Sequence, residues 1–165
     1  MYRIGDKVIY GSHGVCCVVG EEERTIDKRK VMYLALEPMG QGGSRFLVPT
    51  HNPVAMGKLC HVLTRQELDV LLHSEEIRKD AWIRDENLRK QTYRELIGSG
   101  DRQRMLSMIY TLYQHRAAQA EAGKKVHLCD DNFLRDAEKL LLSEIAMVME
   151  LTPEQAKQYL RESLT

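Results

Sequence analysis

The sequence predicts an α+β protein, in which a small SH3-like or Tudor-like antiparallel β-barrel is followed by an all-helical bundle. The chain has 165 residues, enough for one ordinary domain or two small ones. Short β-rich runs fill the first third, and after Pro53 apolar residues recur at three- and four-residue intervals. We therefore expect a barrel over residues 1–53, a linker over 54–63 and a helical domain over 64–165.

The expected strands are short and separated by turn residues. Glycine and serine follow the first run, and a glycine-rich loop around residues 38–43 precedes the last one. Four or five short strands within about 50 residues are too few for a β-sandwich, so a small barrel is favoured. The runs cover residues 7–10, 15–19, 31–36 and 45–49.

Capping signals divide the rest of the chain into five expected helices. Residues 64–67 have the form of a capping box, and residues 152–155 combine a capping box with a proline at the first helical position. Apolar side chains follow each signal at helical spacing. The expected helix starts are Thr64, about residue 81 for a helix over 81–97, Asp101, Asp130 or Asp131, and Thr152.

Charge is balanced over the whole chain but not along it. The 24 Lys and Arg equal the 24 Asp and Glu, so no net field attracts nucleic acid or a membrane. Residues 54–125 hold thirteen basic against ten acidic residues, whereas residues 126–165 hold four against eight. Any phosphate contacts are therefore expected in the first three helices.

The sequence favours a cytoplasmic protein with no membrane partner. The N-terminus does not resemble a signal peptide, and no window approaches roughly 18 uninterrupted apolar residues. The four cysteines, at positions 16, 17, 60 and 129, lack the CxxC spacing of common zinc sites. We expect them to be reduced thiols.

No arrangement typical of catalysis is present. The HExxH and GxSxG patterns are missing, and the glycine-rich loop lacks the Lys-Ser/Thr of a phosphate loop. The local pairs Cys60–His61 and His127–Cys129 are a weak signal for a metal site, because neither has a third ligand at turn-like spacing. We expect no enzyme, metal, cofactor or small-molecule substrate.

Trp82, the only tryptophan, allows two interpretations from the residues alone. On an ideal helix from residue 81, Arg84, Asn87, Gln91 and Arg94 share one face, and Trp82 lies on roughly the opposite one. The ring then packs in the bundle core, and the polar face is ordinary solvated surface. In the other interpretation, an exposed ring beside arginines presses against a base step from the minor groove.

Residues 4–15, IGDKVIYGSHGV, resemble the N-terminal signature of the CarD/CdnL family of bacterial transcription regulators. The similarity continues in order through residues 24–26, residues 47–49, Trp82 followed by residues 99–101, and residues 140–146. The resemblance implies a non-enzymatic factor with a Tudor-like RNA-polymerase-interaction domain and a helical domain.

The resemblance also implies partners and site residues. The barrel is expected to dock on the RNA polymerase β subunit, and the helical domain to reach promoter DNA with little sequence readout. Trp82 is similar to the family tryptophan that lies at the minor groove and favours the open complex. The residues implied for polymerase are Arg24, Ile26, Arg45 and Leu47; those implied for DNA, besides Trp82, are Arg84, Arg89, Lys90, Lys124 and Lys125.

A second hypothesis assigns the same modules to a different task. In it the protein is a protein-interaction adaptor without DNA contact, and Trp82 belongs to the core of the helical domain. A thiol- or metal-dependent enzyme using Cys16, Cys60 or Cys129 is a third class, which the missing motifs disfavour.

Overall fold

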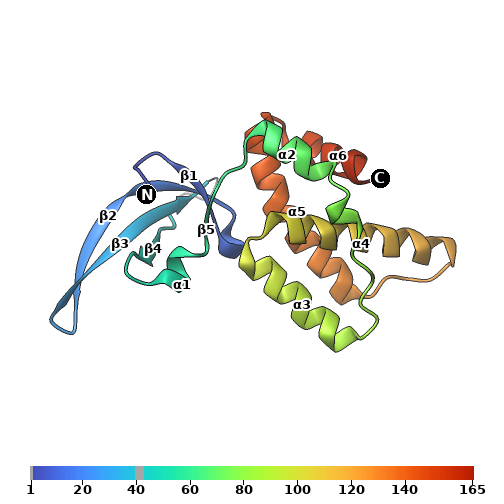
Figure 1. Ribbon diagram of the computed structural model, residues 1–165, viewed down its shortest axis with the longest axis horizontal. Coiled ribbons are helices and arrows are strands. Elements are labelled where there is room, and N and C mark those ends of the chain that lie inside the picture. Colours follow the sequence, from blue (N-terminus) through green and yellow to red (C-terminus); the bar gives the residue numbers. More distant parts are fainter. Residues whose placement is uncertain (1, 40–42) are drawn as a thin grey trace. The chain divides into compact units, whose positions relative to one another are not determined.

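A computed structural model shows two compact units, one ending at Val62 and the other spanning Leu63–Thr165 (Figure 1). The structure describes residues 2–39 and 43–165, so the centre of the expected glycine-rich loop lies outside the described residues. The first unit is a β-sheet and the second is helical, which confirms the α+β prediction.

The first unit is an antiparallel sheet whose described strands follow the order β4-β3-β2-β1-β5. One face carries the core, in which Val8, Leu36 and Val48 are fully buried beside Cys16. Burial raises the pKa of the Cys16 thiol to about 11. The strands are β1 (Lys7–Tyr10), β2 (Val15–Ile26), β3 (Arg29–Pro38), β4 (Phe46–Pro49) and β5 (Leu59–His61).

The β2–β3 hairpin is longer than the sequence predicted. The strand expected from the sequence ends at Val19, because Gly20 and the charged stretch around residues 27–30 are typical of turns. Instead, the pairing register shifts between Val18 and Gly20, so a bulge absorbs the glycine and the strand continues. The turn comes at Asp27 and Lys28, whose φ angles of 50° and 64° are the positive values required by a two-residue type I′ hairpin.

Residues 54–62 of the expected linker over residues 54–63 belong to the first unit, and Leu63 belongs to the second. Residues 54–62 contain most of the short helix α1 (Pro53–Met56), which Asn52 caps by accepting hydrogen bonds from the Val54 and Ala55 amides at 3.0 and 3.2 Å. The strand β5 follows and pairs with β1. Because Leu59 on β5 is buried in the sheet core, this segment is held by both hydrogen bonds and apolar packing.

In the fully described range 63–165, five helices of eight or more residues form the bundle. The capping boxes at Thr64 and Thr152 and the cap at Asp101 are present as predicted. The longest helix, α5, packs against each of the other four (Figure 1). The helices are α2 (Arg65–Leu72), α3 (Glu86–Ser99), α4 (Arg102–Glu121), α5 (Leu128–Met149) and α6 (Pro153–Leu164).

Two expected helix starts are wrong. The helix expected from residue 81 begins at Glu86, because Asp85 is its cap and accepts a hydrogen bond from the Leu88 amide at 2.8 Å. Trp82 therefore lies in a segment without regular secondary structure before the helix. Asp130 does not cap α5 either. The helix begins at Leu128, and Asp130 is buried within its first turn, where it pairs with an arginine.

A buried carboxylate ties together the beginning of the helical unit, α4 and α5. Glu144 on α5 is 2% exposed. One of its oxygens accepts a hydrogen bond from the Leu63 amide at 2.9 Å, and the other accepts one from Arg102 Nε at 3.1 Å. A carboxylate removed from water in this way is stabilised only by such partners.

Replacing Glu144 by alanine is expected to lower the free energy of unfolding by about 3–5 kcal/mol, because it removes a buried acceptor from two partly buried donors, one of them a charged arginine. Glu150→Ala is the matched control, since Glu150 also pairs with an arginine, Arg65, but its side chain is 82% exposed. That change is expected to cost less than about 1 kcal/mol. Urea unfolding of both variants measures the difference, and equal costs would contradict the assigned role of Glu144.

Candidate functional site

Trp82 is half-buried, and its ring contacts the side chains of His115 and Arg89. Its ring stacks on the imidazole of His115 from α4, with centroids 3.6 Å apart and planes inclined by 6°. The guanidinium carbon of Arg89 lies 4.5 Å from the centroid of the indole, within the range of a cation–π contact. The indole therefore has a defined orientation at the edge of the helical core, against which it packs.

Arg89 is itself fixed by a buried ion pair between α3 and α5. Its Nε and second terminal nitrogen donate to the two carboxylate oxygens of Asp130 at 2.8 and 3.1 Å, and its first terminal nitrogen donates to the Ile83 carbonyl at 3.0 Å. The two side chains are 4% and 1% exposed. Burial lowers the pKa of Arg89, but the hydrogen bonds and charge of Asp130 outweigh it, and the net shift is upward.

The surroundings of Arg89 differ from those of the exposed basic residues expected at DNA. A phosphate contact requires an accessible guanidinium, whereas this one is buried and already committed to Asp130 and the Ile83 carbonyl. In this structure Arg89 contacts the ring of Trp82, and its contact with DNA stays a prediction.

The other residues expected at DNA are distributed over two connections and one helix. Arg84 is exposed in the segment that carries Trp82 and makes no ion pair within the described residues. Lys90 on α3 pairs with Glu86 at 2.7 Å, which offsets its charge. Lys124 and Lys125 are exposed in the connection between α4 and α5. Only Trp82 and Arg89 of the expected set are thus in observed contact.

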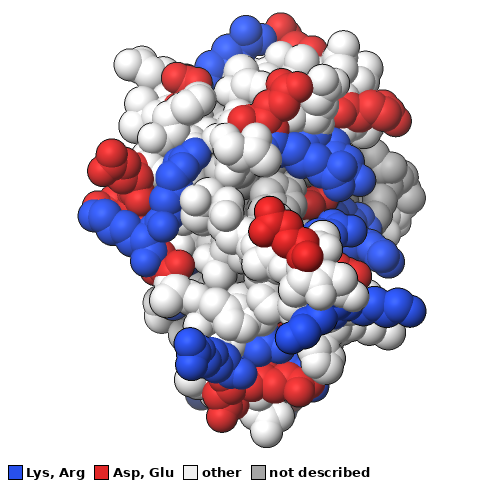
Figure 2. All heavy atoms as spheres, turned by 90° about the vertical axis from the view of Figure 1, so that its right-hand side faces the viewer, with Lys and Arg blue, Asp and Glu red and all other residues white. Residues whose placement is uncertain are grey.

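The surface charge of the helical unit is mixed. On the face seen in Figure 2, basic side chains alternate with acidic ones and form no continuous basic surface. Such a pattern gives little long-range attraction for a polyanion.

The sheet presents a second surface, on the side opposite its core. Leu34 and Leu36 of β3 point into the core. Because successive side chains of a strand alternate between faces, Val31, Tyr33 and Ala35 lie on the other side. We call this side of β2, β3 and β4 the outer sheet face.

The strand register brings the residues expected at polymerase to the outer sheet face. Arg24 on β2 lies opposite Val31, and Leu47 on β4 lies opposite Ala35. Ile26 follows Arg24 by two residues, so it shares this face, and it is 47% exposed. Residues far apart in the sequence therefore form one surface with both charged and apolar groups.

Arg45 joins the same surface through ion pairs. It lies 3.8 Å from a Glu22 carboxylate oxygen and 3.6 Å from one of Glu37. Glu22 also accepts two hydrogen bonds from Arg24. All four expected polymerase residues thus lie on the outer sheet face, and two of them are linked through one acidic side chain.

Sequence reasoning missed several neighbours of these residues. A surface hollow of about 470 Å³ adjoins Ile26 and includes Val31, Tyr33 and His51. Val31 and Tyr33 lie at alternate positions of β3, on the side away from the core residues Leu34 and Leu36, so strand alternation places them on the outer sheet face once the strand is recognised. His115, which contacts Trp82 together with Arg89, and Asp130, which pairs with Arg89, left no local signal, because their partners come from other parts of the chain.

None of the described helices is both long and apolar enough to cross a membrane.

Each of the two structural units corresponds to a match with a protein-family model. Residues 2–60 match the model described as the CarD-like/TRCF RID domain, and residues 67–161 match the CarD C-terminal domain. The two matches together cover most of the chain, and the boundary between them agrees with the end of the first unit at Val62. The family is one of transcription factors and not of enzymes. The chain belongs to the CarD family of RNA-polymerase-interacting transcription regulators.

Proposed function

We propose that this protein binds the RNA polymerase β subunit through the outer sheet face and promoter DNA through the segment around Trp82, and thereby stabilises the open complex. The observation that carries the proposal is the placement of Trp82. It lies outside the helices, half-buried and oriented on His115 and Arg89. Family membership supports the polymerase contact.

A pre-oriented indole suits insertion into distorted DNA. Apolar wedges in the minor groove stabilise unstacked base steps, and each unstacking costs a few kcal/mol. A ring that is already ordered loses little side-chain entropy on contact, so more of its interaction energy opposes that cost. Stacking on His115 and the cation–π contact with Arg89 supply this order in the free protein.

Phosphate contacts complete the proposed DNA site. Arg84 is exposed two residues after Trp82 and is therefore the leading candidate. Lys124 and Lys125 are exposed as well, whereas Lys90 first has to leave Glu86. Contacts of this kind position the protein without reading the base sequence.

DNA binding by the free protein is expected to be weak, because the chain carries no net charge. Attachment to polymerase raises the local concentration of the Trp82 segment at the promoter and makes a weak contact effective. We infer a cytoplasmic location, where bacterial polymerase and promoter DNA are found.

One observation favours a second candidate function. Trp82 packs against the apolar core of the helical unit, as a residue with a purely structural role does. In that case the protein is an adaptor that binds polymerase through the sheet and another protein through the helices.

Arg24→Glu is expected to weaken binding to the isolated β-subunit lobe by about tenfold, roughly 1.4 kcal/mol, because it reverses a charge on the outer sheet face. Lys30→Glu is the matched control. Lys30 lies on the same hairpin but points to the opposite face, where it pairs with Glu23. Equal losses for both variants in a binding titration would show that the outer sheet face is not the docking surface.

Trp82→Ala is expected to reduce promoter opening by about tenfold, roughly 1.4 kcal/mol, and to leave affinity for polymerase unchanged. Leu88→Ala serves as the control, since Leu88 is 54% exposed on the neighbouring helix. A fluorescent open-complex assay measures the effect, and circular dichroism checks the fold. Normal opening with the alanine variant would favour the adaptor.

The stacking contact between His115 and Trp82 is expected to depend on pH, because His115 can gain a proton. Burial lowers the pKa of His115, the charges of Arg89 and His127 lower it further, and Asp130 opposes them. The folded state thus binds this proton less readily than the unfolded state, so the contribution of His115 to stability is present above its ordinary pKa and is lost as pH falls toward the folded value.

Emission from Trp82 is expected to change in a single step below pH ~6.5, as His115 gains a proton beside Arg89. His115→Gln should remove this step. His73→Gln, at the exposed C-cap of α2, should preserve it. A fluorescence titration in which the step survives loss of His115 would contradict the assignment.

A further inference from the structure

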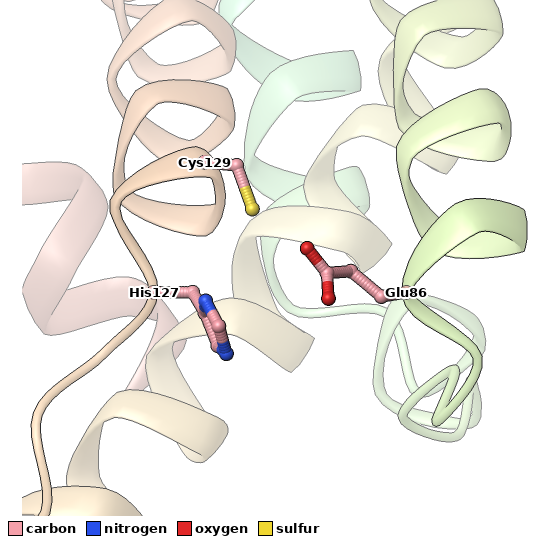
Figure 3. A group of neighbouring side chains, drawn as sticks. All are labelled: Glu86, His127 and Cys129. Atoms are coloured by element: carbon pink, nitrogen blue, oxygen red, sulfur yellow. The ribbon is translucent and has the colours of Figure 1, made fainter.

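Three side chains of different chemistry converge at the adjacent starts of two helices (Figure 3). Glu86 is the first residue of α3, His127 is the N-cap of α5, and Cys129 lies in the first turn of α5. One potential ligand atom from each lies within 4.8 Å of the others, and no other group of this kind occurs among the described residues.

We propose that Glu86, His127 and Cys129 bind one Zn²⁺ ion, with water as the fourth ligand. Carboxylate, imidazole and thiolate are all established zinc ligands, and the thiolate and imidazole disfavour Mg²⁺ and Ca²⁺. The carboxylate and the thiolate together also balance the charge of a dication. The position left for water makes this an open site.

The distances require only a small adjustment. Zinc bonds of about 2.0–2.3 Å in a tetrahedron separate the ligand atoms of one carboxylate, one imidazole and one thiolate by roughly 3.3–3.6 Å. Since the present atoms lie within 4.8 Å of one another, the separations have to shrink by roughly 1.5 Å at most. Glu86 and His127 are exposed, so rotation of their side chains can supply this movement.

The backbone beneath the site is already fixed. Arg89 follows Glu86 by about one helical turn, and Asp130 directly follows Cys129. The buried ion pair between Arg89 and Asp130 therefore holds the two helix starts at a set separation. Because the backbone at this site is already ordered, little conformational entropy is lost when an ion binds, and the affinity of the site for the ion is correspondingly higher.

One neighbour competes with the metal. The ammonium of Lys90 lies 2.7 Å from Oε1 of Glu86, whereas the other carboxylate oxygen has no hydrogen-bond partner among the described residues. That second oxygen is the one available to zinc. The sequence signal for this site was incomplete, because His127–Cys129 formed only a local pair and Glu86 comes from another helix.

The test uses Co²⁺ as a spectroscopic probe on the full chain under reducing conditions. We expect one Co²⁺ per chain, a near-ultraviolet thiolate-to-cobalt charge-transfer band, and loss of that band when Zn²⁺ is added. Cys129→Ser should abolish the band, and Glu86→Gln should weaken cobalt binding at least tenfold. Lys90→Gln should tighten it, because the competing cation is gone.

Matched variants identify the site. Cys60→Ser removes the thiol of the other Cys–His pair, which lies in the sheet unit, and should leave the band unchanged; Glu76→Gln removes another exposed glutamate that pairs with a lysine and should also have no effect. Circular dichroism of the metal-free variants checks folding.

Several results would overturn the proposal. These are retention of the band in Cys129→Ser, unchanged affinity in Glu86→Gln, or several equivalent weak ions per chain without a thiolate band. Because the assay contains neither polymerase nor DNA, its failure is distinguishable from failure of the proposed function.

Discussion

The buried ion pair between Arg89 and Asp130 determines the geometry of the helical unit's functional end. It connects the first turns of α3 and α5 and fixes the guanidinium over which Trp82 lies. Two charges removed from water are stable only when fully hydrogen-bonded, and here both carboxylate oxygens and the Ile83 carbonyl accept from the arginine. The pair therefore specifies where the indole and the proposed zinc ligands lie, more than it adds to overall stability.

The fold was largely predictable because its signals are local. Thr64 and Thr152 begin helices through capping boxes, whose members lie three residues apart in the sequence. The failures arose where a distant partner decides the structure. Asp130 has the sequence context of a cap but is buried against Arg89, and β5 in the expected linker forms because β1 offers it a strand to pair with.

The candidate sites also contain some features that follow from local sequence and others that depend on a distant partner. The outer sheet face follows from strand alternation, so Arg24 and Leu47 could be placed together once the register was known. The burial of Arg89 could not be inferred, because arginines at helical spacing are usually solvated and its partner Asp130 comes from another helix. Family resemblance suggested charges near the tryptophan but did not distinguish the one that orients the ring from those free to contact phosphate.

The margins of the sheet are unusually short compared with its central hairpin. β4 has four residues and ends at Pro49, which has no amide hydrogen to donate, and β5 has three. The long strands β2 and β3 are each flanked on both sides in the order of the sheet. However, β1 pairs only with residues 15–17 of β2, and β4 pairs only with residues 33–36 of β3, so the distal part of the hairpin has an unpaired edge on each side. Charged residues such as Glu21, Glu23 and Lys30 line this part, and charges of this kind disfavour edge-to-edge pairing with a second molecule.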